Sequence, residues 1–346
     1  MDNPPRSAGI CAHCQTPATK RCSGCRGAAE YDKVTPEPTF YCSSACQTQH
    51  WGEHKVKCKQ LQARKSLSRA ATLLQAILYR IRLHAHTVQS TKAHVDGSRV
   101  ILRHAKEDKS KAYRPLGPLF LKLKGGDQRV FDAIVMMGSC TEAIVFLYVF
   151  VRDILSNLCS RIEELTVEIL KEISIERPDG TPLTYTKNHH VYRVTLNNGE
   201  IWAINPSGAQ YGFSQCLSPW REFENTRLIS IHREANLGYH RVEIRRSCYH
   251  LKDRCTVIWW AELFDLAAAL EEKIPTLSSS HGGNLKLILQ GSEAVFQNAK
   301  NELLDKLGNC VNLCLDKTFA PQSIAMRSQL VDIRMALEKS TSHPER

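Results

Sequence analysis

The feature that most constrains this chain is a run of paired metal-ligating residues near its start. The sequence places two Cys-x2-Cys pairs, one Cys-x3-Cys pair and one His-x3-Cys pair between residues 11 and 58. The x2 spacing suits a tight turn whose two thiolates converge on one metal, and the x3 spacing puts both ligands on one face of a helical turn. The pairs are Cys11/Cys14, Cys22/Cys25, Cys42/Cys46 and His54/Cys58.

These eight residues predict two structural zinc ions. Structural Zn²⁺ takes four sulfur or nitrogen ligands in a closed tetrahedron, so eight ligands imply two ions. Residues 8–60 contain almost no aliphatic side chains. A segment of that kind cannot build a hydrophobic core and needs a cross-link such as a bound metal to fold. Because the ligand sets leave no open position for water, we expect the zinc to supply folding free energy rather than chemistry.

The ligand order resembles a MYND-type zinc finger, together with the sequences YCSSACQ around Cys42 and HW ahead of His54. The resemblance implies a protein partner, bound through a short proline-containing peptide, rather than DNA. A sixteen-residue insert between the second and third pairs departs from the family pattern and predicts a longer loop. Tyr41 and Trp51 either pack on the zinc sites or form the peptide groove. The resemblance also implies the pairing of ligands: Cys11, Cys14, Cys42 and Cys46 on one zinc, and Cys22, Cys25, His54 and Cys58 on the other.

Cysteine usage and composition indicate the compartment. The first ten residues, MDNPPRSAGI, lack the apolar run of a secretory signal, and the chain holds 14 cysteines. In a reducing compartment cysteine serves as metal ligand, nucleophile or core residue rather than in disulfides. We therefore expect an intracellular protein of the cytoplasm or nucleus. The most apolar stretch, 130–155, is interrupted by Glu142, so a buried helix is expected there rather than a membrane span.

The net charge of +11 is unevenly distributed. Residues 1–60 carry +3, residues 61–115 carry +9, and residues 116–346 carry −1. Apolar residues at helical spacing over 60–83 predict a basic amphipathic helix that docks on the body. The basic excess is available to nucleic acid, an acidic membrane or an acidic partner, although a solvated helix face explains it equally well. Aromatic residues are sparse among these charges, so nucleic acid is not an expected partner.

The remainder of the chain predicts an α+β body. Two alternating β-branched and aromatic runs around Asn198-Gly199 predict a hairpin over 190–205. We expect further strands at 228–232, 240–245, 255–260 and 284–289, and helices at 263–272, 293–307 and 323–338. The predicted fold is a small two-zinc MYND-type finger plus an α+β body domain with an antiparallel hairpin and buried helices. Its predicted divisions are a finger at 8–60, a basic helical connector at 61–115 and a body at 116–346.

The body also contains a candidate nucleophile, Cys140. Ser139 and Glu142 have capping-box spacing, which predicts Ser139 as N-cap and Cys140 as the first helical residue. A thiol there faces the positive end of the helix dipole, which stabilises thiolate. A two-residue turn at Asn198-Gly199 would place His190 and Asn205 on one face of the hairpin as diagonal neighbours, with His189 on the other face.

This order of residues is similar to the core of papain-like and transglutaminase-like enzymes. The similarity implies Cys140 as nucleophile, His190 as general base and Asn205 as the residue that orients the imidazole. A buried core cysteine and a structural hairpin histidine explain the same residues without activity. Two functions therefore follow from the sequence. The first is an interaction protein that recruits or scaffolds a partner, which the resemblance links to transcription. The second is a thiol hydrolase or acyltransferase that uses the finger as a targeting module.

Overall fold

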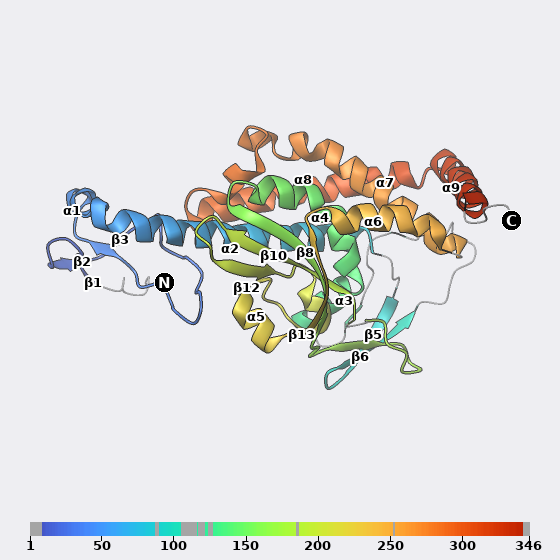
Figure 1. The fold of residues 1–346 in the computed structure, drawn as a ribbon, viewed down its shortest axis with the longest axis horizontal. Coiled ribbons are helices and arrows are strands. Elements are labelled where there is room, and N and C mark those ends of the chain that lie inside the picture. The colour runs from blue at the N-terminus through green and yellow to red at the C-terminus, as the bar shows by residue number, and fades with distance from the viewer. Residues whose placement is uncertain are drawn as a thin grey trace.

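A single 34-residue helix, α2 (Trp51–His84), runs from the finger into the body (Figure 1). The computed structural model describes residues 9–86, 90–104, 116, 122–123, 127–184, 187–251 and 253–341. In the part of α2 that follows the finger, Leu67, Leu74 and Ile81 are fully buried in the main hydrophobic core. The predicted amphipathic helix that docks on the body is thus confirmed. The last part of the predicted connector, 105–115, lies outside the described residues.

An antiparallel five-stranded sheet forms the centre of the body. Its strand order is β12-β11-β10-β8-β13. The strands are β8 (Cys159–Ile169), β10 (His189–Leu196), β11 (Ile201–Ile204), β12 (Leu217–Pro219) and β13 (Leu228–Asn236). The predicted hairpin is β10–β11, which is confirmed as an element.

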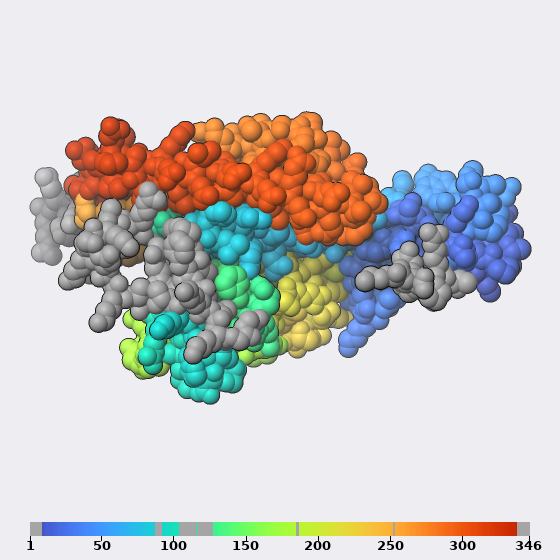
Figure 2. Space-filling model, turned by 180° about the vertical axis from the view of Figure 1, so that it is seen from behind, coloured from blue at the N-terminus to red at the C-terminus, as the bar shows by residue number. Residues whose placement is uncertain are grey.

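The two faces of this sheet carry separate apolar clusters because side chains alternate along each strand. Tyr192 and Trp202 face the main core, whereas Val191 and Ala203 face a second cluster that includes Phe223. The helices of the main core are α2, α4 (Ser139–Leu155), α7 (Arg254–Leu277) and α8 (Glu293–Thr318). Figure 2 shows the finger at one end of the elongated molecule, with the α7–α8 region along one side.

Smaller elements complete the described fold. A second sheet of order β7-β5-β6-β9 packs against α3 (Gln128–Val135). Its strands are β5 (Ser90–Asp96), β6 (Arg99–His104), β7 (Lys122–Leu123) and β9 (Ser174–Glu176). The remaining helices are α5 (Trp220–Thr226), α6 (Tyr239–Ser247) and α9 (Pro321–Thr341). The finger adds β1 (Gly9–Ile10), β2 (Pro17–Ala18), β3 (Lys20–Arg21), β4 (Phe40–Tyr41) and α1 (Ser44–Gln49).

Three predicted strands are wrong, because helix-terminal signals prevail over β-branched composition. The segment 240–245 lies in α6, which starts after Gly238 in the left-handed conformation. The segment 255–260 lies in α7, whose N-cap Asp253 accepts hydrogen bonds from two backbone N–H groups of the first turn. The segment 284–289 forms a 3-10 helix, η4 (Leu285–Leu289), capped by Asn284. Strand 228–232 and the three predicted helices are confirmed.

The apolar stretch 130–155 folds into α3 and α4, and α4 is buried in the main core. Its Glu142 forms a buried ion pair with Arg82 of α2 at 2.6 Å. No single described helix is long and apolar enough to cross a membrane; α3 and α4 reach that composition only as a pair, bent by 74°. The charge in the middle of this stretch is thus accommodated by an ion pair inside the core.

The basic charges of α2 are matched by acids of the body. Four of its arginines make ion pairs with residues far away in the sequence, two of them on α8. The pairs are Arg64–Glu200, Arg69–Glu293, Arg80–Asp305 and Arg82–Glu142. Part of the +9 excess of residues 61–115 is thus offset within the molecule.

The long insert between Cys25 and Cys42 holds the finger against the β10–β11 hairpin. The Tyr31 ring lies 5.1 Å from the ring of Trp202, and its hydroxyl accepts a hydrogen bond from the backbone N–H of Ile201. Arg64 stacks over Tyr31 and makes a bidentate pair with Glu200, which is almost fully buried.

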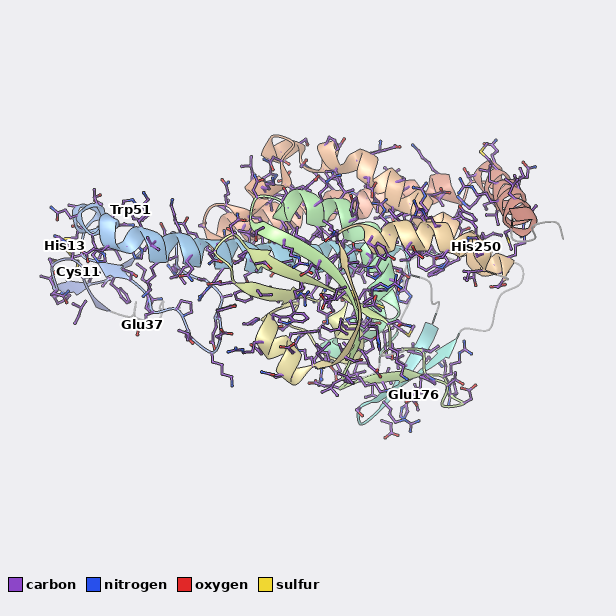
Figure 3. The ribbon with its side chains drawn as sticks, viewed as in Figure 1. Cys11, His13, Glu37, Trp51, Glu176 and His250 are labelled. Carbon is purple, nitrogen blue, oxygen red and sulfur yellow. The ribbon has the colours of Figure 1, made fainter. Side chains whose placement is uncertain are left out.

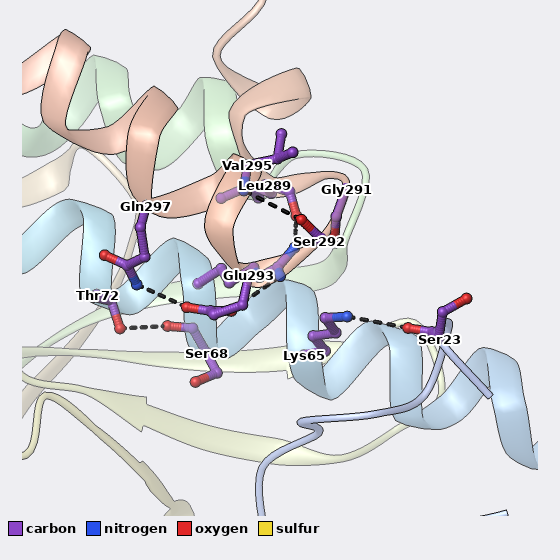
Figure 4. Close-up of polar contacts among 11 residues, drawn as sticks. Ser23, Lys65, Ser68, Thr72, Leu289, Gly291, Ser292, Glu293, Val295 and Gln297 are labelled. Carbon is purple, nitrogen blue, oxygen red and sulfur yellow. Dashed lines mark hydrogen bonds and ion pairs between the residues drawn. The ribbon is translucent and has the colours of Figure 1, made fainter. Parts of the chain in front are cut away.

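Further along α2, a second set of contacts joins this helix to the finger and to the residues just before α8 (Figure 4). Lys65 donates to the Ser23 carbonyl of the finger, and Arg69 donates to two carbonyls in the loop before α8. Finger and body are therefore braced together along one helix. The boundaries at residues 60 and 115 stay predictions.

Candidate functional site

The first metal-ligand group brings together Cys11, Cys14, Cys42 and Cys46. The Sγ atoms of Cys14 and Cys42 lie 3.5 Å apart, and those of Cys46 and Cys14 lie 3.8 Å apart. Ser43 caps α1, because its hydroxyl accepts from the backbone N–H of Cys46, and the cap fixes the turn that holds both x3-spaced thiols.

The second group brings together Cys22, Cys25, His54 and Cys58. The Sγ atoms of Cys22 and Cys58 lie 3.7 Å apart, and Cys25 Sγ lies 3.7 Å from His54 Nε2. His54 and Cys58 occupy successive turns of α2, so this helix contributes half of the site. All four residues of this group are buried.

The geometry of both groups fits zinc. A tetrahedron with Zn–S bonds of about 2.3 Å has edges of about 3.8 Å, close to the sulfur separations in both groups. Within each group the candidate ligand atoms lie within 4.8 Å of one another. The donor sets, four cysteines in one group and three cysteines with one histidine in the other, are those of structural zinc sites. The partition is the one that the resemblance implied, and zinc bound here would close both tetrahedra with protein ligands.

Tyr41 and Trp51 have different environments. Tyr41 is 1% exposed within the finger's apolar cluster, and its hydroxyl lies 3.0 Å from His50 Nδ1. Trp51 is 38% exposed on the outer surface of the finger (Figure 3). Tyr41 is therefore a packing residue. Trp51 packs edge-on against His54 while keeping an open face.

A groove of about 270 Å³ lies on the finger between β1, β4 and the start of α2. Its lining combines apolar side chains with two carboxylates and one ammonium group. The lining residues include Ile10, Pro38, Phe40, Glu37, Glu53 and Lys57. Ile10 is 63% exposed, so its side chain presents apolar surface at the edge of the groove.

The candidate nucleophile Cys140 is the second residue of α4, not the first. Gly138 is the N-cap, in the left-handed conformation, and the Ser139 hydroxyl donates to the Met136 carbonyl instead of capping the helix. Cys140 is partly exposed. Burial raises the pKa of its thiol, against smaller lowering effects of Thr141, the His190 backbone and Gln210.

The predicted pairing of His190 with Asn205 is wrong, and His189 takes its place. His189 Nε2 lies 2.9 Å from Asn205 Oδ1. The hairpin loop has three residues, Asn197 to Gly199, so Tyr192 pairs with Ile204, and the one-residue displacement moves the opposite histidine to the Asn205 face. The sequence contained a signal for this loop, since Gly in its third position is typical of three-residue hairpins.

His190 belongs to a different network. Its Nδ1 lies 3.4 Å from the Thr166 hydroxyl, which also contacts His240, and His240 Nδ1 lies 3.1 Å from Glu164. Burial, followed by the neighbouring His240 and His189, lowers the pKa of His190 to about 3. This histidine is therefore a neutral structural group on the other face of β10.

Sequence reasoning missed Gln210, which links the thiol region to His189. Gln210 Oε1 accepts a hydrogen bond from the Gly138 backbone N–H, and its Nε2 lies 3.5 Å from His189 Nδ1. Gln210 belongs to the short helix η1 (Gly208–Tyr211), which follows β11. Nothing in its spacing from Cys140 or His189 identified it.

Comparison with known protein families matches residues 11–58 to the MYND finger model. The N-terminal unit is therefore a MYND finger with two Cys/His clusters suited to two zinc ions, and MYND fingers generally are protein–protein interaction modules. No curated protein and no solved structure matches the chain. The suggested likeness of the body to papain-like or transglutaminase-like enzymes accordingly has no support from relatives.

Proposed function

We propose that this protein recruits a partner protein by binding a short proline-containing peptide in the groove of its MYND finger. The groove lined by Ile10 and Phe40 is the observation that carries the proposal, because it leaves apolar surface open beside the second ligand group. MYND fingers often bind proline-rich motifs, and Pro38 and Thr39 give the groove a rigid rim.

The charged residues that line the groove suggest which residues flank the proline of the bound peptide. Glu37 and Glu53 outnumber Lys57 along its lining, so a Lys or Arg beside the proline would find a carboxylate within the groove. The body would act as the scaffold that carries the finger, since α2 and the insert hold the two together. Fourteen cysteines, seven of which lie in the two metal-ligand groups, suit the reducing cytoplasm or nucleus.

Substitution Ile10→Glu tests the groove. Zinc-loaded full chain is first used to select peptides from a phage-displayed library with a central proline, and fluorescence polarisation then measures their affinity. We expect Ile10→Glu to weaken binding at least about tenfold, since it places a charge on the apolar rim. Val56→Glu is the matched control, because Val56 is 78% exposed on α2 and does not line the groove.

Both variants should retain the zinc content of the parent protein. Equal loss of binding in Ile10→Glu and Val56→Glu, or unchanged binding in Ile10→Glu, would contradict a groove-bound peptide.

A further inference from the structure

The last described helix, α9, lies at the end of the molecule opposite the finger and carries apolar residues on two sides (Figure 1). On one side Arg327 and Val331 are 7% and 2% exposed, and Val331 packs with residues of α7. On another side Met326, Leu330 and Ile333 are each more than half exposed. Their spacing of four and then three residues places them in one row along the helix. A contiguous exposed apolar row of this kind is typical of an interaction surface.

A cavity of about 420 Å³ lies beside this row. It is enclosed by α9, α7, the end of α8 and the segment from the end of α6 to the short helix η2 (Cys248–His250). The apolar and aromatic side chains that line it are Met326, Leu330, Val331, Ala261, Phe264 and Tyr249. Because Met326 and Leu330 belong both to the cavity and to the exposed row, the two form one continuous surface.

The charged residues that line the cavity are four cations and one carboxylate. The buried Arg327 is paired with the carboxylate, that of Asp265, at 2.9 Å and with Glu262 at 3.4 Å. The other three cations make no ion pair with any residue that the structure describes, and they are Arg245, Lys317 and Arg334. An apolar surface is thus bordered by positive charge that the protein itself does not neutralise.

Two of these cations are held in place by aromatic rings. The Arg334 guanidinium lies 4.8 Å from the centroid of the Tyr249 ring, and that of Arg245 lies 5.6 Å from the centroid of the Phe264 ring. Stacking covers one face of a guanidinium but leaves the N–H groups in its plane free to donate, and their fork geometry matches a carboxylate. Both groups are therefore positioned to receive an acidic side chain at the edge of the cavity.

We propose that the row on α9 and the adjacent cavity bind an acidic amphipathic helix of a partner protein. A large apolar side chain of this helix fills the cavity, and Asp or Glu residues beside it pair with Arg245 and Arg334. A helix matches the row because Met326 to Ile333 spans about 10 Å, the length over which two turns of a facing helix present their i, i+3, i+4 and i+7 residues. The surface shares no residue with the groove of the finger, so this partner is distinct from the proline-containing peptide.

Charge and shape distinguish this occupant from two others. A second copy of the chain would bring the same three cations against Arg245, Lys317 and Arg334, and like charges that face each other oppose association. An acidic membrane would attract the cations, but a flat surface would leave the cavity beside α9 unfilled. An acidic helix satisfies both the charge and the concave shape.

The test selects helical peptides on the zinc-loaded full chain. The phage-displayed library has peptides of about 20 residues, long enough to form helices, with apolar residues fixed at i, i+3, i+4 and i+7 and the other positions randomised. We expect Asp and Glu to be enriched over Lys and Arg at the randomised positions. Selection on the double variant Arg245→Glu/Arg334→Glu should abolish this enrichment, because it removes the carboxylate partners.

Fluorescence polarisation then measures the affinity of a selected acidic peptide. Leu330→Glu should weaken binding at least about tenfold, since it places a carboxylate in the apolar row. The matched control is Leu313→Glu, which changes a residue of α8 that is 66% exposed and does not line the cavity. This control should change the affinity less than about twofold.

Four results would overturn the proposal. The first two are selection without enrichment of acidic residues and equal weakening by Leu330→Glu and Leu313→Glu. The third is a dimer in sedimentation velocity that Leu330→Glu abolishes, which would assign the row to a second copy. The fourth is flotation with phosphatidylserine vesicles that Leu330→Glu abolishes, which would assign it to a membrane. These results leave the finger untested, because none of them involves the residues of its groove.

Discussion

At the residue scale, the two adjacent histidines of β10 belong to separate hydrogen-bond networks, because successive side chains of a strand point to opposite faces. His189 belongs to the series of hydrogen bonds that links Gly138, Gln210 and Asn205, and His190 belongs to the network of Thr166 and His240. Both rings are buried, and burial is the main cause of their low pKa values, about 4 for His189 and about 3 for His190. Just below pH 6.5, each ring therefore stays uncharged in the folded protein, whereas the same ring in the unfolded chain takes up a proton.

These pKa values predict acid sensitivity with a definite sign. The pKa of His189 lies near 4 when folded and near 6.5 when unfolded, so the unfolded state binds the additional proton as pH falls through 6.5. His189 alone should therefore reduce the free energy of unfolding by about 2 kcal/mol between pH 7 and pH 5. Urea denaturation of the parent protein and of His189→Gln at both pH values measures this.

Between pH 7 and pH 5, the free energy of unfolding of His189→Gln should fall by about 2 kcal/mol less than that of the parent protein. An equal loss in the two proteins would show that His189 ionises in the folded state as readily as in the unfolded one. Zinc must be in excess in both cases, so that ligand protonation in the finger cancels in the comparison.

At the scale of elements, α2 is stabilised at both ends by contacts that differ in kind. Its start holds two metal ligands, and its last turns hold a fully buried guanidinium, that of Arg82. Arg82 pairs with Glu142 and also donates to the carbonyls of Val135, the last residue of α3, and of Met137, which lies between α3 and α4. One side chain thus satisfies the polar groups at the 74° bend between these helices.

Removal of one partner of this pair should be severely destabilising. Arg82→Met leaves Glu142 buried and unpaired, which costs about 3–5 kcal/mol. Arg82→Met combined with Glu142→Leu should recover at least half of that loss. Arg80→Met is the control on the same helix, because its pair with Asp305 is exposed and contributes less than about 1 kcal/mol. Urea denaturation measures all three, and a loss after Arg82→Met as small as that of the control would contradict a buried charge pair.

Elements with local signals could be predicted, whereas those decided by distant contacts could not. Ligand spacing identified the finger, and apolar periodicity identified the part of α2 from residue 60 onward. Asp253 and Gly238, which start α7 and α6, are short-range signals that the β-branched residues after them obscured. The site was located only in part: the motif around Cys140 was visible in the sequence, but the choice of His189 depended on one residue in the hairpin loop, and Gln210 depended on tertiary packing.

At the scale of the whole molecule, metal removal should affect the two ends differently. Four of the seven residues in the finger's buried apolar cluster are cysteines, so this end has little core without zinc. Treatment with EDTA should release two zinc ions per chain and abolish hydrogen-exchange protection across residues 11–58. The main core of the body contains none of the eight ligands, so β8 and β10 should keep their protection.

The control for this experiment is Cys255→Ser, which removes an exposed cysteine outside both groups and should leave the release at two ions. Cys46→Ser, which removes one ligand of the first group, should release fewer than two zinc ions per chain. Loss of protection in β8 and β10 together with the finger would contradict independent stability of the two ends.

The shared helix also limits how this protein can be rearranged in evolution. α2 supplies His54 and Cys58 to the finger, and its next turns supply Leu67 and Leu74 to the body's core. A recombination event that cut the gene after Cys58 would separate the finger from the turns of α2 that hold it to the body, and would leave the body's part of α2 without the two zinc ligands at its start. The MYND finger is therefore not an exchangeable cassette in this chain, and insertions or fusions would be tolerated before Cys11 or after α9 rather than within α2.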